Sequence, residues 1–195
     1  MIDFLSIRIA DFLCRKGIIK EEDKELYIYG YQLLISSFIG ILLTIILGIV
    51  FGKLLETILY LVIFISTRQR CGGYHAKHFL TCIISFLSAY LMVMLLESYL
   101  LQMDYVLYCI LMELIYLITV IRFAPMEHMN KPLSQEVKLV NRKKSIQYSV
   151  FWILLSIPAY FLLEKMAIMI ALTLVTIASF MLLEIILKEV NENEE

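Results

Sequence analysis

Residues 30–51, GYQLLISSFIGILLTIILGIVF, decide the fold class of this chain. No charged side chain interrupts the stretch, and a helix of about 20 apolar residues crosses a hydrocarbon core about 30 Å thick. The whole chain of 195 residues is 61% hydrophobic, whereas soluble domains contain roughly 45–50% apolar residues. The sequence therefore predicts an integral membrane protein.

Five further apolar stretches follow and predict a helical bundle over residues 30–187. They cover residues 54–66, 80–96, 105–121, 146–163 and 167–187. The stretch 54–66 is short and carries Glu56, so a tilted or re-entrant segment fits it as well as a full span. We expect an all-α integral membrane protein with about six transmembrane or half-inserted helices. Four spans with two half-inserted segments are the alternative.

Residues 1–17 predict an amphipathic helix that lies in the membrane interface. Leu5, Ile9 and Phe12 recur at helical spacing, whereas charged side chains such as Arg8 take the other face. Gly17 is expected to end this helix. The segment is too short and too charged to cross a membrane, and it lacks the apolar core and cleavage site of a signal peptide. An ordinary packed helix is the alternative.

The basic residues indicate the orientation of the bundle. Of the 17 Lys and Arg residues, all but Lys53 and Lys165 fall in alternate segments between the predicted spans. Positively charged segments stay on the cytoplasmic side. This asymmetry predicts an even number of crossings, with both termini and residues 67–82 in the cytoplasm. No separate soluble domain is evident, so we expect one domain over residues 1–195, ending in a polar tail at 188–195.

Residues 67–82, TRQRCGGYHAKHFLTC, concentrate the reactive side chains of the chain between two apolar stretches. A cysteine becomes a strong nucleophile when a histidine or a positive field favours its thiolate. His78 precedes Cys82 by one helical turn, whereas His75 reaches Cys82 only if the chain bends. Gly72 and Gly73 permit such a bend. Spacing alone favours His78 as the partner of Cys82.

The same residues also permit a metal-binding interpretation. On an uninterrupted helix, Cys71, His75, His78 and Cys82 would form one stripe of ligands. Structural zinc sites, however, usually draw paired ligands from two separate elements. The interpretation without a functional role is that these are only polar residues at the membrane interface. All four cysteines are expected to be free thiols, since the cytosol is reducing.

Two motifs resemble the accessory gene regulator B (AgrB) family of membrane cysteine endopeptidases in Gram-positive quorum sensing. The first is Arg68 followed by CGGYHAK (residues 71–77) and Cys82. The second is FAPME (residues 123–127) followed by NKPL (residues 130–133). The hydrophobic layout, the amphipathic start and the length are also similar over almost the whole chain.

The resemblance implies a specific chemistry and a set of site residues. His75 is implied as the general base and Cys82 as the nucleophile, with Arg68 and Gly73 supporting the site. Independently of the resemblance, the charge of Arg70 and the spacing of His78 to Cys82 place these two residues as further supports of the same site. The enzyme would remove the tail of a small quorum-sensing precursor and cyclise the remainder as a thiolactone or lactone. The resemblance also implies a possible homodimer and no metal. We further expect no cofactor and no nucleic-acid partner.

The expected peptide partner has an amphipathic leader and an acidic C-terminal tail, and the other partner is the lipid bilayer. Five basic residues could bind the acidic tail: Lys131, Lys138, Arg142, Lys143 and Lys144. These residues could equally only set the topology and contact anionic lipid. The competing functional hypotheses are a small multi-span transporter or peptide exporter, with Glu113 lining its path, and a metal-binding membrane protein.

Overall fold

The computed structural model describes residues 2–73, 79–126 and 134–194, with side chains up to residue 190. Within these ranges the chain forms helices and no strands. Each of the six predicted apolar stretches falls in one helix, apart from the last residues of two of them, Phe51 and Leu163, which follow the ends of their helices. This agreement confirms the all-α fold class. The helices are α1 (Ile2–Arg15), η1 (Glu21–Asp23), α2 (Lys24–Val50), α3 (Leu54–Cys71), α4 (Phe79–Leu100), α5 (Tyr105–Phe123), α6 (Gln135–Leu162) and α7 (Glu164–Glu194).

Five of these helices are long and apolar enough to cross a membrane. They are α2 together with η1, and then α4, α5, α6 and α7. The helix α3 is not among them, because its 18 residues include Glu56 in the first turn and Arg68 and Arg70 in the last turn. This helix corresponds to the short stretch for which a re-entrant or tilted segment was the expected alternative.

The helices α6 and α7 extend furthest beyond the predicted apolar stretches. The helix α6 begins at Gln135, well before Ile146, because Ser134 caps its first turn by accepting a hydrogen bond from the backbone N–H of Val137. The intervening residues are mostly good helix formers such as Gln, Glu, Lys and Arg. At the other end of the chain, α7 continues as a helix through the predicted polar tail as far as Glu194.

The chain divides into two compact units. The first unit comprises Met1–Leu47 and Ala76–Ser88, so it contains α1, most of α2 and the start of α4. Here Gln32 of α2 donates a hydrogen bond of 2.8 Å to Asp3 of α1. Gly17, with φ +67, follows the end of α1 and reverses the chain. The predicted amphipathic helix is therefore present and bound to the start of α2.

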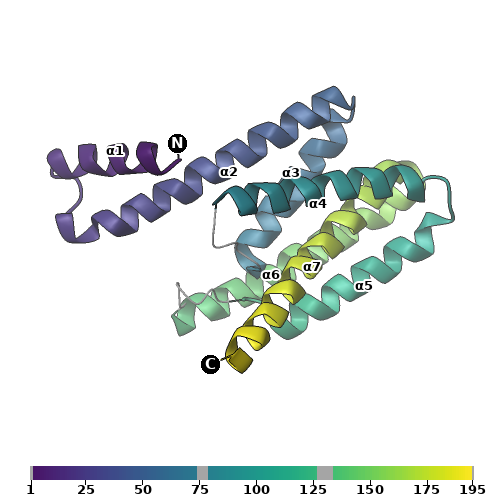
Figure 1. The fold of residues 1–195 in the computed structure, drawn as a ribbon. Helices are drawn as coiled ribbons and strands as arrows, with labels where there is room; N and C mark the ends of the chain where they lie inside the picture. The colour runs from purple at the N-terminus through teal and green to yellow at the C-terminus, as the bar shows by residue number, and fades with distance from the viewer. Residues whose placement is uncertain (1, 74–78, 127–133, 195) are drawn as a thin grey trace. The chain divides into compact units, whose positions relative to one another are not determined.

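The second unit comprises Gly48–His75 and Ala89–Glu195 and is organised around α7. Figure 1 shows α7, in yellow, running alongside α5 and α6, and it also packs against α3. In the 18-residue apolar segment of α7, 61% of the residues are buried, whereas the other four candidate spans reach at most 28%. The central position of α7 explains this difference, because the outer helices leave their apolar side chains for lipid.

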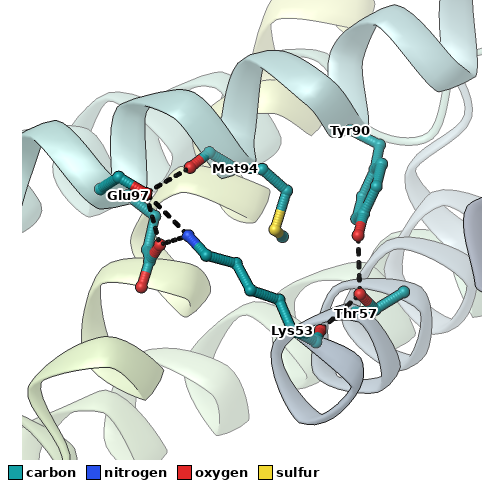
Figure 2. Close-up of polar contacts among 6 residues, drawn as sticks. Lys53, Thr57, Tyr90, Met94 and Glu97 are labelled. Atoms are coloured by element: carbon teal, nitrogen blue, oxygen red, sulfur yellow. Dashed lines mark hydrogen bonds and ion pairs between the residues drawn. The ribbon is translucent and has the colours of Figure 1, made fainter. Parts of the chain in front are cut away.

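A cluster of polar side chains holds the N-terminal end of α3 in this unit (Figure 2). Lys53 forms an ion pair with Glu97 of α4 and donates a hydrogen bond of 2.7 Å to Ser98. Thr57 and the hydroxyl of Tyr90 lie 2.7 Å apart in a second hydrogen bond between α3 and α4. Glu97 and Tyr90 are fully buried, so the bond between Thr57 and Tyr90 is shielded from water and the ion pair of the half-buried Lys53 is partly shielded. Together these bonds connect the two helices.

Candidate functional site

The C-terminal end of α3 brings the two sequence motifs together. The helix ends at Cys71, where Gly72 takes φ +76 and donates a backbone hydrogen bond to Arg68 O. The N–H of Met126, from the second motif, donates a hydrogen bond of 2.9 Å to Cys71 O. A Cβ atom on Gly72 would lie 2.5 Å from Met126 O. Glycine at this position therefore allows the two motifs to touch.

Gly73 lies directly against the backbone of α7. Its φ of +132 is in the region that favours glycine. A Cβ atom there would lie 3.6 Å from both Met181 N and Phe180 C, which is ordinary van der Waals contact. Gly73 is buried, so α7 supports the chain at the point where it leaves α3.

Arg68 lies against two aromatic rings, one on its own helix and one on α7. Its Cζ atom is 5.2 Å from the ring centroid of Phe64 and 5.0 Å from that of Phe180. The two rings are 6.0 Å apart and nearly perpendicular, at 81°. A guanidinium within about 6 Å of an aromatic face is attracted by the negative charge of that face. The two rings thus form a corner that holds Arg68.

The residues that follow Arg68 face α6. Arg70 donates a hydrogen bond of 3.4 Å to the side-chain oxygen of Asn141. The thiol of Cys71 is fully buried and lies beside the hydroxyls of Ser145 and Tyr116. The resemblance left Cys71 without a role, and the structure places it in the packing between α3, α5 and α6.

The predicted nucleophile, Cys82, is a free cysteine near the start of α4 and is half-buried. It belongs to the first unit. His75 and His78 lie outside the described residues. Cys14 on α1 is also a free, half-buried cysteine. Partial burial raises the pKa of Cys14, and the neighbouring Glu21 raises it further.

The metal-binding interpretation required one uninterrupted helix through residues 71–82. The structure contradicts this premise, because α3 ends at Cys71 and Gly72 and Gly73 follow in a non-helical conformation before α4 begins at Phe79. Cys71 and Cys82 therefore lie on different helices. Among the described residues, no group of three or more His, Cys, Asp or Glu side chains could hold a metal ion.

Four of the five predicted tail-binding residues lie on the first turns of α6, and not in a loop. Arg142 and Lys143 are exposed, whereas Lys138 and Lys144 are half-buried. Lys131 lies outside the described residues. Lys138 and Arg142 are one helical turn apart and share a face, and Arg142 donates a hydrogen bond of 3.4 Å to Ile121 O at the end of α5. The basic residues therefore form a helical surface beside the second motif.

Glu113 is buried in the middle of α5 and is only 6% exposed. Its side chain lies beside Ser156 and Tyr160 of α6, and its Oε1 has no hydrogen-bond partner among the described residues. A carboxyl group in such a place is a functional candidate by default. The structure associates it with α6 and the second unit.

The fold and these sites define the class of this protein: a helical membrane protein with a motif-bearing site at the end of a short internal helix. A model of the family Accessory gene regulator B matches residues 6–186. The chain therefore belongs to the AgrB family. Family membership suggests a role in quorum-sensing peptide processing.

Two curated relatives from Clostridium perfringens support this assignment. AgrB-like protein 2 of strain 13 / Type A is 30% identical over 152 residues, which cover 74% of this chain and 70% of the relative. The AgrB-like protein of strain SM101 / Type A is 28% identical over the same shares of the two chains. No solved structure matches this chain significantly.

Proposed function

We propose that this protein is a membrane cysteine endopeptidase that removes the C-terminal tail of a quorum-sensing precursor peptide and cyclises the remainder. The proposal is supported by one observation: the chain matches the AgrB family, and the described residues of its first motif lie in a buried or half-buried setting. The family model covers residues 6–186, and the first motif includes Cys82 as a free, half-buried thiol. In the same motif, Arg68 and Gly73 are held against α7.

The first step of the proposed reaction forms an acyl-enzyme. His75 accepts the proton of the Cys82 thiol, and the thiolate attacks the carbonyl carbon that precedes the tail. The C–N bond of this peptide group breaks, and the protonated His75 returns its proton to the leaving amine. The tail departs as a free peptide, and the rest of the precursor remains on Cys82 as a thioester.

The second step closes the ring and releases the enzyme. A cysteine thiol or serine hydroxyl within the precursor attacks the thioester carbonyl, and the Cys82 sulfur leaves and regains a proton. A thiolactone replaces one thioester by another, so this step is nearly balanced in energy. Water would instead yield a linear product, so the site must exclude it.

The acidic tail and the basic surface of α6 are complementary in charge. Arg142 and Lys143 are exposed near the start of α6 and could attract such a tail over a Debye length of about 8 Å at physiological salt. The basic segments also support an arrangement with the site and both termini on the cytoplasmic side. Contact between these residues and anionic lipid is the competing role.

The test is tail release by the full-length protein in lipid vesicles. The substrate is the precursor peptide encoded nearest to this chain, and mass spectrometry measures the free tail and the ring. We expect Cys82→Ser to abolish both products. Cys14→Ser is the matched control, since Cys14 is also free and half-buried, and it should retain wild-type rates. Equal tail release by wild type and Cys82→Ser would refute the proposal.

Transport is the second candidate, because the buried carboxyl of Glu113 with its open Oε1 is a feature of membrane transport paths. A transporter needs no nucleophile. Uptake of the labelled precursor into vesicles that persists in Cys82→Ser and is lost in Glu113→Gln would favour transport. Tail release that persists in Glu113→Gln would favour the peptidase.

A further inference from the structure

We infer that Phe180 and Met181 of α7 are positioning residues for the site, because they fix Arg68 and Gly73 at the end of α3. The inference rests on the proposed function for the role of Arg68 and Gly73. It adds an element that no motif of the sequence includes, since α7 lies about 100 residues after the first motif.

Two independent contacts converge on adjacent residues of α7. The ring of Phe180 lies 5.0 Å from the Cζ atom of Arg68. One residue later, the backbone nitrogen of Met181 would contact a Cβ atom on Gly73 at 3.6 Å, and its side-chain Cγ would do so at 3.7 Å. A single turn of α7 therefore touches both site-supporting residues.

Packing holds this turn of α7 in place. Met181 is fully buried, as are Ile177 and Ala178 in the preceding turn. The helix α7 packs against α3, α5 and α6 at once. Buried side chains in a close-packed interior keep their place, because any shift opens voids or overlaps. Phe180 therefore presents its ring to Arg68 from a fixed support.

The second ring completes the orientation of Arg68. Phe64 stacks on Tyr60 at 5.4 Å, and Tyr60 contacts the buried Tyr90 of α4 at 5.3 Å. The guanidinium thus lies between a ring fixed through α4 and a ring fixed through α7. An arginine held in this way loses little entropy when it acts on a substrate, since its long side chain is already ordered.

The test replaces the ring of Phe180 while it keeps an apolar side chain. In Phe180→Leu, we expect kcat/KM for tail release to fall about tenfold, because the attraction between the cation and the ring is lost. Phe180→Tyr keeps the aromatic face and should stay within about twofold of wild type. Phe161→Leu is the matched control, because Phe161 is 84% exposed at the end of α6.

A second readout reports the position of Arg68 without any substrate. The side-chain N–H signal of Arg68, assigned with Arg68→Lys in protein labelled with ¹⁵N-arginine, should be shifted by the nearby rings. Phe180→Leu should move this signal, and Phe180→Tyr and Phe161→Leu should not. An Arg68 signal unchanged in Phe180→Leu, or equal losses of activity in the Leu and Tyr variants, would overturn the inference. No tail release by wild type would instead count against the proposed function.

Discussion

The two ends of α3 are held in opposite ways. At the N-terminal end, charges are paired: Lys53 binds Glu97, and Thr57 bonds Tyr90. At the C-terminal end, the cation Arg68 lies against aromatic rings, and two glycines with positive φ carry the chain onward. Under the proposed function, the N-terminal end contributes to stability, whereas the C-terminal end carries the motif residues Arg68 and Gly73.

The largest expected effect on stability comes from breaking the buried pair at the N-terminal end. Glu97→Ala leaves the ammonium of Lys53 without its carboxylate partner. Loss of one partner from a buried pair costs about 3–5 kcal/mol, and the 26% exposure of Lys53 favours the lower part of that range. Denaturant unfolding in mixed micelles would measure the loss.

The matched control replaces both partners. Lys53→Met combined with Glu97→Leu exchanges the ion pair for an apolar contact, which should recover most of the lost free energy of unfolding. The tail-release rate per folded protein should stay near the wild-type rate in both variants. If Glu97→Ala were as stable as wild type, the ion pair would contribute nothing to the stability of the N-terminal end of α3.

A smaller loss of stability is expected at the C-terminal end. Gly72→Ala would force a side chain into φ +76 and bring its Cβ within 2.5 Å of Met126 O. The backbone conformation alone, with φ +76 and ψ −157, costs a residue other than glycine about 1–3 kcal/mol, and the overlap adds to it. Because the two motifs must separate, we expect tail release to fall much further than stability does, and kinetic assays with unfolding curves would measure both.

Gly52→Ala is the control for this prediction. Gly52 has φ +66, close to that of Gly72, but no atom lies within 4 Å of its Cβ position. Gly52 precedes the N-terminal end of α3. Gly52→Ala should therefore lower the free energy of unfolding only through its backbone conformation, and tail release should stay intact. If Gly52→Ala and Gly72→Ala reduced tail release equally, the contact with Met126 would have no special part in the site.

The smallest effect concerns an exposed ion pair in the first unit, Asp11 with Lys24 at 2.8 Å. The hydrogen bond from Lys24 lowers the pKa of Asp11 below its usual value. The pair therefore helps to bind α1 to α2 above the unfolded pKa of about 3.9, and this help is lost as the pH falls through the lower folded value.

Hydrogen exchange of α1 measured against pH would test this sign. The protection factors of the α1 amides, which are corrected for the intrinsic exchange rate at each pH, should fall on acidification in wild type. In Asp11→Asn they should be lower at neutral pH and respond less to acid. Wild-type protection factors for α1 that stay constant down to pH values below about 3 would contradict the prediction. The contrast with Glu97 would show how burial, and not charge alone, decides the value of an ion pair.

The helices could be predicted from the sequence because hydropathy is a local property. All but the last residue of the uncharged run 30–51 lies in α2 (Lys24–Val50). The short stretch 54–66, which a re-entrant segment fitted equally well, lies in α3, the helix with three charges. The basic residues before Ile146 concealed the start of α6, because a charged helix has no apolar stretch to mark it. The helix propensity of these residues and the capping residue Ser134 were the sequence signals that could have indicated this start.

The contacts of the site could be predicted only in part. The motifs named Arg68, Gly73 and Cys82, but nothing local indicated that Met126 would bond Cys71 or that Phe180 would contact Arg68. The partner of Lys53 was equally hidden, since Glu97 is 44 residues away. Such pairs depend on how helices pack, and hydropathy does not encode the packing partner.

The central claim is that Cys82 forms a thioester with the precursor. The most direct measurement is the intact mass of the full-length protein in lipid vesicles after incubation with the precursor encoded nearest to it. The account predicts a mass increase equal to the precursor without its tail, removed by hydroxylamine, present in Cys14→Ser and absent in Cys82→Ser. Release of the tail without any adduct on Cys82, or an adduct that persists in Cys82→Ser, would contradict it.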